Sequence, residues 1–190
     1  MRHFDKATIE TLVELEKTRT EFWNLDRASA NFLNMLIKIS NAKNVLELGT
    51  SNGYSGVWLA KALEETGGRL TTVEFWDKRL DVAAENFKTC KVSSLIETRL
   101  GSASHILKDL SSSGRVFDFV LIDANKLEYL DYFNLIHPML ISGGIIASDN
   151  ISSHAEKVKP FLDVILNHPE YQNEMFPSEA GLLISRKLKK

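Results

Sequence analysis

The sequence has a single cysteine, Cys90, among its 190 residues. One cysteine excludes an intramolecular disulfide framework and any zinc or iron–sulfur site built from cysteines. We therefore expect a reducing, cytoplasmic setting. A chain of this length buries about 70% of the surface of its unfolded form, so its core needs no covalent or metal cross-links.

Long apolar runs are missing as well. No stretch approaches the roughly 20 consecutive apolar residues that a helix needs to span a bilayer. The first ten residues, MRHFDKATIE, lack the unbroken apolar core of a signal peptide. We therefore expect a protein that is neither secreted nor embedded in a membrane.

An excess of charge of one sign is also missing. The 23 Lys and Arg residues face 25 Asp and Glu residues, which leaves a formal net charge of -2. A near-neutral chain argues against broad electrostatic binding to nucleic acid. With 44% hydrophobic and 25% charged residues, the composition is typical of one globular domain. We expect this domain to cover residues 1–190.

The sequence does have a regular alternation of short apolar runs with helical patterns, which predicts an α/β fold with a doubly wound parallel sheet. The predicted strands are Asn44–Leu48, Arg69–Glu74, Ile96–Leu100, Phe117–Ile122, Gly144–Ser148, Tyr171–Phe176 and Gly181–Arg186. The predicted helices between them are Tyr54–Thr66, Asp77–Cys90, Ala103–Leu110, Leu127–Ile136 and Ala155–Asn167. Only residues 177–180 separate the last two strands, so these strands should pair as an antiparallel hairpin.

Two further helical patterns, Asp5–Lys17 and Arg27–Ile39, precede the first strand. Their apolar residues recur at three- and four-residue spacing, which favours packing or homodimer formation over catalysis. We therefore divide the chain into N-terminal helices, residues 1–40, and a cofactor-binding core, residues 41–190.

A turn with two glycines, Gly49 to Ser55, follows the first strand and leads into a helix. In a doubly wound sheet, ligands bind outside the carboxyl ends of the strands, and glycine lets the backbone approach them closely. Ser51 stands where the dinucleotide fingerprint GxGxxG has its second glycine, which weakens an interpretation as an NAD site. Any tight turn uses glycine, so the turn alone leaves a plain connection open.

Two acidic residues belong to the first two strands. Glu74 ends the second strand, about 20 residues beyond the glycine turn, where a carboxylate can accept hydrogen bonds from ribose hydroxyls. The alternative is an ordinary exposed acid. Glu47 lies inside an apolar strand, where burial of an unpaired carboxylate is costly. We therefore expect Glu47 to be paired or to face a polar, positively charged ligand group, and we expect a ligand that contains adenosine.

Acidic and amide side chains directly follow the fourth and fifth strands: Asp123 after FDFVLI, and Asp149 and Asn150 after GGIIAS. On neighbouring parallel strands these side chains emerge at one edge, with a strand spacing of about 5 Å. Such oxygen ligands suit a hard divalent cation, above all Mg²⁺. Taken singly, a helix cap explains Asp123 and an Asx turn explains the pair. All three at the ligand edge favour a metal site.

Lys126 comes three residues after Asp123, at the start of the next predicted helix. A cation at the amino end of a helix opposes the helix dipole, which favours loss of its proton. A lysine beside a metal can act as a general base. A solvated surface lysine is the alternative. The histidines show no metal-type spacing, and only His154 is expected near the site.

These motifs resemble a known family. VLELGTSNGYS resembles the S-adenosylmethionine loop of class I methyltransferases, and LIDANKLEYLDYF with LISGGIIASDN resembles the metal-dependent catechol and caffeoyl-CoA O-methyltransferases. The match covers residues 44–150, and GLLISRK is similar to the last strand of the family. The resemblance implies a Rossmann-like sheet of seven strands in the order 3-2-1-4-5-7-6, with the last strand antiparallel.

The resemblance also implies roles by position. The cofactor contacts that it implies are Gly49, Tyr54 and Ser55 around the methionine part of S-adenosylmethionine, Glu74 at the ribose, and Ser102 and Ala103 at the adenine. With these we count Glu47, Thr50, Gly53, Phe75 and Asp123. The metal ligands that it implies are Asp123, Asp149 and Asn150, and the implied catalytic base is Lys126.

The activity implied is transfer of a methyl group to a hydroxyl of a small catechol-like aromatic acceptor. Three alternatives stay open: methylation of hydroxyuridine in tRNA, an NAD-dependent oxidoreductase, and a cofactor-binding protein without turnover. The chain departs from the family pattern at Asn125, where bacterial relatives often have Asp, and at Ile151–His154, where they commonly have Trp-x-Gly. The resemblance therefore defines the cofactor and the metal better than it defines the acceptor.

Overall fold

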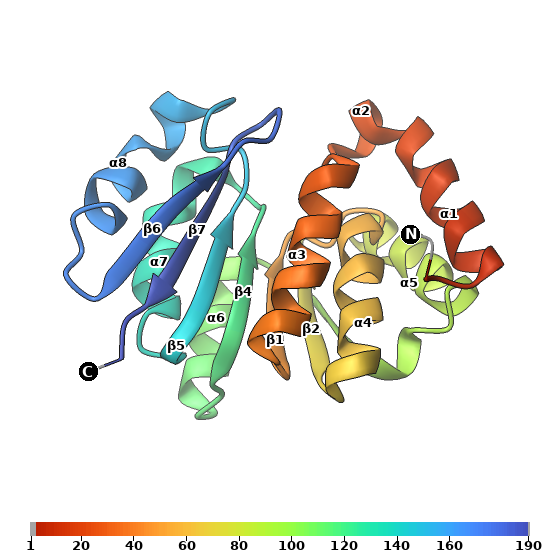
Figure 1. Ribbon diagram of the computed structural model, residues 1–190, viewed down its shortest axis with the longest axis horizontal. Coiled ribbons are helices and arrows are strands. Elements are labelled where there is room, and N and C mark those ends of the chain that lie inside the picture. Colours follow the sequence, from red (N-terminus) through yellow and green to blue (C-terminus); the bar gives the residue numbers. More distant parts are fainter. Residues whose placement is uncertain (1–2, 190) are drawn as a thin grey trace.

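The predicted strands and helices form one layered sheet structure in the computed structural model, which describes residues 3–189 (Figure 1). The strands are β1 Asn44–Leu48, β2 Arg69–Glu74, β3 Ile96–Leu100, β4 Phe117–Ile122, β5 Leu140–Ser148, β6 Tyr171–Phe176 and β7 Leu182–Lys187. The α-helices are α1 Lys6–Lys17, α2 Arg19–Phe22, α3 Arg27–Ser40, α4 Tyr54–Thr66, α5 Asp77–Thr89, α6 Ala103–Ser112, α7 Tyr129–Ile136 and α8 Ala155–Ile165. Two 3-10 helices are η1 Ser93–Leu95 and η2 Lys126–Glu128. None of the helices within residues 3–189 combines the length and the apolar character needed to cross a bilayer.

The strands lie in the order β3-β2-β1-β4-β5-β7-β6. Strands β1 to β5 pair in parallel, whereas β7 runs antiparallel to both β5 and β6. The predicted fold class, strand order and terminal hairpin are therefore confirmed. Because β1 pairs with β2 on one side and with β4 on the other, the winding of the chain reverses at β1, and a crevice is expected at the carboxyl ends of these strands.

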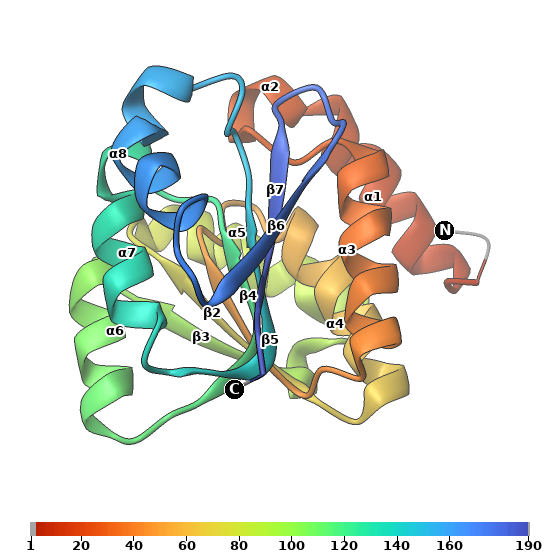
Figure 2. The same cartoon turned by 60° about the vertical axis from the view of Figure 1, so that its left-hand side comes forward.

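Helices cover both faces of the sheet (Figures 1 and 2). Helices α3, α4 and α5 share one apolar core with Trp58, and α6, α7 and α8 share the other with Phe133. Residues of β1 alternate between these cores, with Val45 in the first and Leu46 in the second. Burial on both faces holds β1 rigidly, so the turn at its end has a fixed position.

The N-terminal helices begin at capping residues. The Asp5 carboxylate accepts a hydrogen bond from the N–H of Thr8 at 3.1 Å, and Asp26 accepts one from the N–H of Ser29 at 2.9 Å. Helix α3 packs along α4, and α1 contacts α5. These helices therefore extend the layer that covers one face of the sheet.

Several element boundaries differ from the prediction, among them those of β5, α7 and α8. Strand β5 begins at Leu140 instead of Gly144, because the glycine pair lies in an irregular part of the strand where Gly143 has a φ of +85°. The helix expected from Leu127 opens with the 3-10 turn η2, and α7 starts at Tyr129. Helix α8 ends at Ile165, two residues early. The short helix α2 has no counterpart in the prediction.

Candidate active site

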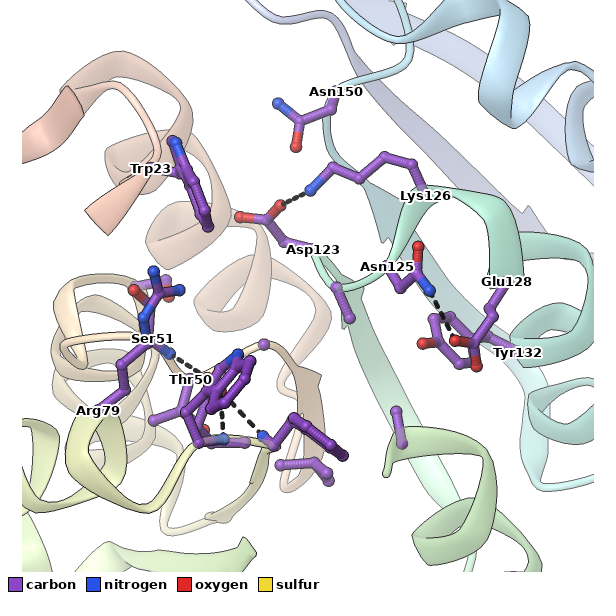
Figure 3. A pocket seen from close by; sticks show the side chains of 18 of the residues that line it. Trp23, Thr50, Ser51, Arg79, Asp123, Asn125, Lys126, Glu128, Tyr132 and Asn150 are labelled. Carbon is purple, nitrogen blue, oxygen red and sulfur yellow. Dashed lines mark hydrogen bonds and ion pairs between the residues drawn. The ribbon is translucent and has the colours of Figure 1, made fainter. Parts of the chain in front are cut away.

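A cavity of about 720 Å³ lies at the carboxyl ends of β1, β2, β4 and β5 (Figure 3). Its wall consists of residues 22–25, 49–51, 55, 73–76, 79, 101–103, 123–128, 132, 150, 154 and 157. This is the edge at which ligands bind in doubly wound sheets, and the volume is within the usual range for small-molecule sites. The fold therefore places a ligand-sized cavity where the sequence predicts one.

The turn after β1 is held tightly against its neighbours. The N–H groups of Gly49 and Thr50 both donate to the carbonyl oxygen of Val73, at 2.9 and 3.1 Å. Gly49 has a φ of +103°, and a Cβ at this position would lie 2.1 Å from the carbonyl oxygen of Asp123. Only glycine fits this backbone, so the turn passes directly beside the carboxyl end of β4.

Glu74 is buried at the cavity wall, with 6% of its surface exposed. Its Oε2 accepts a hydrogen bond from the N–H of Ser51 at 2.8 Å. Its Oε1 accepts bonds from the N–H groups of Phe75 and Trp76 at 2.9 and 3.0 Å. A carboxylate offers about four acceptor sites. Three are used by backbone, so this fixed carboxylate keeps capacity for a ligand hydroxyl.

Other predicted cofactor contacts surround the same part of the cavity. Ser55 lines it from the first turn of α4, and Ser102 and Ala103 line it from the start of α6. Phe75 and Trp76 are exposed over 62% and 60% of their surface, although both are large apolar side chains. An open aromatic face in a cavity wall suits a flat ring of a ligand.

The predicted metal ligands come together at the ends of β4 and β5. Ile122 and Ser148 are register partners, and the N–H of Asp149 donates to the carbonyl oxygen of Ile122 at 3.0 Å. Asp123 and Asn150 line the cavity, whereas Asp149 lies outside its wall and is 4% exposed. The side-chain oxygen of Asn150, whose φ is +62°, points toward Asp123 and Lys126 in Figure 3.

Lys126 joins this group from η2. Its Nζ donates to Asp123 Oδ1 at 2.9 Å. The Lys126 side chain is 19% exposed and that of Asp123 is 15% exposed, so the pair sits largely away from water. The predicted base therefore lies beside the predicted metal ligands.

The acidic cluster has the electrostatics of a cation site. Burial, and after it the negative charge of Asp123, raises the pKa of Asp149 to about 8. Burial also raises the pKa of Asp123, although Lys126 opposes this effect. Asp149 Oδ1 is buried and has no hydrogen-bond partner in the described part of the chain. The carboxylates of Asp123 and Asp149 repel each other, and Asp149 Oδ1 lacks a hydrogen-bond donor. A divalent cation between them would offset this repulsion.

The donor set consists of two carboxylates and one amide. Within residues 3–189, no three His, Cys, Asp or Glu side chains are placed to hold a metal ion together. An Mg²⁺ ion commonly uses only one or two protein carboxylates and takes its other oxygens from water and substrate. The residues present therefore fit an Mg²⁺ ion that also binds its substrate.

Glu47 does not meet the cavity. It is fully buried under the turn, where the Thr72 hydroxyl donates to its Oε2 at 2.6 Å and lies 2.6 Å from the hydroxyl oxygen of Thr50. Burial raises the pKa of Glu47 to about 7, with the hydroxyls of Ser55 and Thr72 opposing the shift. Of the two alternatives expected for Glu47, the structure shows the paired one at Oε2, and the cavity wall does not include this residue. Glu47 Oε1 is buried and has no hydrogen-bond partner within residues 3–189.

Gly53 and Tyr54 also lie outside the wall. A Cβ on Gly53 would lie 2.7 Å from a ring carbon of Phe87, so this glycine allows close packing of α4 and α5. The Tyr54 hydroxyl donates to Glu16 Oε1 at 2.8 Å, and Glu16 is ion-paired with Arg27. Their positions in the turn suggest ligand contact, but Gly53 makes room for Phe87, and the Tyr54 side chain ties α4 to α1.

The structure adds an N-terminal segment to the site. Trp23 directly follows α2, has a φ of +56° and is 72% exposed. The guanidinium of Arg79 lies 4.7 Å from the centre of a Trp23 ring. The Ser51 hydroxyl donates to the carbonyl oxygen of Phe22 at 2.8 Å. The aromatic pair FW between two helical patterns is the sequence signal that points to this segment.

Two more residues of the cavity wall come from the start of α8. His154, which was expected near the site, and Lys157 both belong to the cavity wall. Burial, followed by the positive charges of Lys126 and Lys157, lowers the pKa of His154. Two cations therefore act on one imidazole at the end of the cavity that contains Asn150.

Comparison with known proteins gives a consistent set of matches. Residues 3–164 match the model of the O-methyltransferase family. A catechol O-methyltransferase from Niastella koreensis is 40% identical over 121 residues, which are 63% of this chain and 54% of that protein. Caffeoyl-CoA O-methyltransferase 1 from Eucalyptus globulus is 34% identical over 157 residues, which are 80% of this chain and 63% of that protein. The chain thus spans 54 to 63% of the length of these two relatives.

A solved structure matches over most of its length. The O-methyltransferase from Bacillus cereus in complex with SAH superposes with a TM-score of 0.85 at 25% identity, and the match covers 96% of this chain and 91% of that chain. The layers and the strand order described above are therefore shared with a protein that carries SAH.

Proposed function

This chain belongs to the O-methyltransferase family, and on that premise we propose that it transfers a methyl group from S-adenosylmethionine to a hydroxyl of a small vicinal dihydroxy aromatic molecule. We further propose that the transfer depends on a divalent cation, Mg²⁺. One observation carries the proposal: the buried carboxylate of Asp149 and the partly buried carboxylate of Asp123 come together beside Lys126, at the edge of a ligand-sized cavity.

The walls of the cavity support S-adenosylmethionine as the methyl donor. The turn at Gly49 lets backbone lie close to the ligand, and Glu74 can accept a hydrogen bond from a ribose hydroxyl. The exposed rings of Phe75 and Trp76 offer a face to a flat adenine. SAH, present in the Bacillus cereus structure, is what S-adenosylmethionine becomes after it has lost the methyl group.

Asp123, Asp149 and Asn150 are the residues that would hold the cation. When bound, a divalent cation lowers the pKa of the acceptor hydroxyls and fixes two vicinal oxygens. The protein contributes rigidity, since Asp123 and Asp149 directly follow strands that are paired in register. Such positioning of two reactants can supply as much as about 7 to 11 kcal/mol of barrier reduction.

We assign the proton transfer to Lys126. Once Nζ has released one proton to water, it can take the proton of the acceptor hydroxyl while the oxygen of that hydroxyl attacks the methyl carbon. The carbon–sulfur bond breaks, its electron pair returns to the sulfur, and neutral SAH leaves. Asp123 holds Nζ at 2.9 Å and so keeps the base at the cation end of the cavity.

Methyl transfer to matched acceptors tests the proposal. Catechol and resorcinol have the same composition, but only catechol has two vicinal hydroxyls that can share one cation. With labelled S-adenosylmethionine and Mg²⁺, we expect methylation of catechol and none of resorcinol. Equal transfer to both, or transfer only to a tRNA that contains hydroxyuridine, would contradict the proposed acceptor.

A further inference from the structure

The cationic side chains of the cavity wall differ in how their charge is balanced. Lys126 is paired with Asp123, and the guanidinium of Arg79 lies over the ring of Trp23. Lys157 also lines the cavity, but it forms no ion pair with any residue between positions 3 and 189. Lys157 is exposed, and its positive charge has no ion-pair partner among the described residues.

The acids of the wall are already engaged. Glu74 accepts three backbone N–H groups, and Asp123 holds Lys126. Glu128 accepts hydrogen bonds from the Asn125 amide at 2.7 Å and from the Ser104 hydroxyl at 2.8 Å. A negative charge that balances the cation on α8 would have to come from the ligand.

The start of α8 has a fixed orientation. His154 directly precedes α8 and Lys157 lies in its first turn, and both line the cavity. The next residue, Val158, is fully buried in the core and anchors this turn. Lys159 instead pairs with Asp163 at 2.6 Å among exposed side chains. Both lysines of this helix are exposed; Lys157 lines the cavity, whereas Lys159 lies outside its wall and is paired with Asp163.

We propose that the methyl acceptor carries a carboxylate, on its aromatic ring or on a short side chain, and that Lys157 binds this group. The inference rests on the proposed function, because it concerns the acceptor of that reaction. Asn150 and Lys157 reach the cavity from one continuous segment that ends β5 and begins α8. A small aromatic acid can thus place its two hydroxyls beside Asn150 and its carboxylate at Lys157, and opposite charges also speed the encounter.

Two acceptors of equal size test the inference. We would measure kcat and KM for 3,4-dihydroxybenzoate and for 3,4-dihydroxybenzamide, which differ in charge at one position, with saturating S-adenosylmethionine and Mg²⁺. The wild type should prefer the acid by about fivefold in kcat/KM, mainly through KM. Lys157→Gln should bring the ratio close to one, Lys157→Glu should reverse it, and Lys157→Arg should retain it.

Lys159→Gln is the matched control, because it removes a lysine from the same helix outside the cavity wall; its ratio should equal that of the wild type. Equal use of acid and amide by the wild type, or a ratio that Lys157→Gln leaves unchanged, overturns the inference while the proposed function stands. If neither compound nor catechol is methylated, the proposed function fails and the inference fails with it.

Discussion

Asp149 is the residue on which the metal proposal depends most. Its carboxylate is 4% exposed, one of its oxygens has no hydrogen-bond partner in residues 3–189, and Asp123 lies close enough to raise its pKa. A protein gains no stability from such an arrangement, because burial and repulsion both disfavour the charge. We interpret this unfavourable burial of the Asp149 charge as the consequence of a role in cation binding.

Replacing Asp149 should separate turnover from donor binding. We expect Asp149→Asn to lower Mg²⁺-supported kcat/KM by about 100-fold or more, because the cation loses a charged ligand. The Kd for S-adenosylmethionine should stay within a factor of about two, since Asp149 lies outside the cavity wall. Steady-state kinetics and titration calorimetry measure the two effects. Asp163→Asn, an exposed change on α8, should alter neither, and normal turnover in Asp149→Asn would refute the assignment.

Glu47 lies outside the cavity wall and is fully buried, where its carboxyl accepts a hydrogen bond from Thr72. Its folded pKa of about 7 exceeds the ordinary value of 4.5, so the folded state binds the proton more tightly than the unfolded state. Stability contributed by this group is therefore lost as the pH rises from about 4.5 to about 7. At 1.36 kcal/mol per pKa unit, the loss is at most about 3 kcal/mol.

Glu47→Gln should remove this pH dependence. We expect the free energy of unfolding of the variant, relative to the wild type, to improve by about 1 to 3 kcal/mol between pH 4.5 and pH 8. Urea titrations of both proteins at the two pH values give the difference directly. Any constant cost of the new amide cancels in this comparison. A relative stability that is the same at both pH values would show that Glu47 titrates normally.

At the scale of elements, the site depends on turns that bring β1, β2 and β4 together at their carboxyl ends. Gly49 lets the first of these turns pass the carbonyl oxygen of Asp123. The same turn binds Glu74 through the N–H of Ser51 and binds the end of α2 through its hydroxyl. One turn thus positions the proposed donor site, the cation site and the N-terminal segment.

A methyl group at Gly49 should disturb all of these contacts. In Gly49→Ala the added Cβ would lie 2.1 Å from the carbonyl oxygen of Asp123, and alanine disfavours the φ of +103°. We therefore expect the free energy of unfolding to fall by about 1 to 3 kcal/mol. We also expect markedly weaker binding of S-adenosylmethionine. Gly67→Ala is the matched control, because its φ is +71° but nothing lies within 4 Å of the added Cβ. It should cost about 1 kcal/mol and leave the donor Kd unchanged. Equal effects on binding in both variants would contradict the close approach.

The elements also show what could be predicted from the sequence. Apolar periodicity located all seven strands, and the rule that ligands bind at carboxyl strand ends placed Glu74, Asp123 and Asn150 at the cavity. The sequence could not show that a threonine hydroxyl donates to Glu47, because Thr72 comes from a neighbouring strand. The contact between the end of α2 and the turn after β1 could not be predicted either, because contacts between distant segments leave no local sequence pattern.

At the scale of the whole molecule, the cavity joins parts of the chain that are far apart. Its wall includes residues 22–25 from the N-terminal region and residues 150, 154 and 157 from the last third of the chain. A ligand that contacts both regions binds the folded state and has little affinity for the unfolded chain. Donor binding should therefore stabilise the entire structure.

S-adenosylmethionine at 100 times its Kd should add about 2.7 kcal/mol to the stability. For a protein of this size the Tm should rise by about 5 to 10 °C. Glu74→Gln should lose more than half of this rise at the same donor concentration, because the ribose loses a charged acceptor. Glu85→Gln, a change at an exposed position, should keep all of it. Differential scanning calorimetry measures each shift, and an unchanged rise in Glu74→Gln would contradict the assignment of Glu74.

The central claim is that methyl transfer needs a cation held at Asp123, Asp149 and Asn150. The most direct measurement is the rate of transfer from S-adenosylmethionine to catechol, first with Mg²⁺, then with excess EDTA, and then with Mg²⁺ restored above the EDTA. We predict that EDTA abolishes transfer, that Mg²⁺ restores it, and that the donor still binds in EDTA. Full transfer in the presence of EDTA would contradict the account.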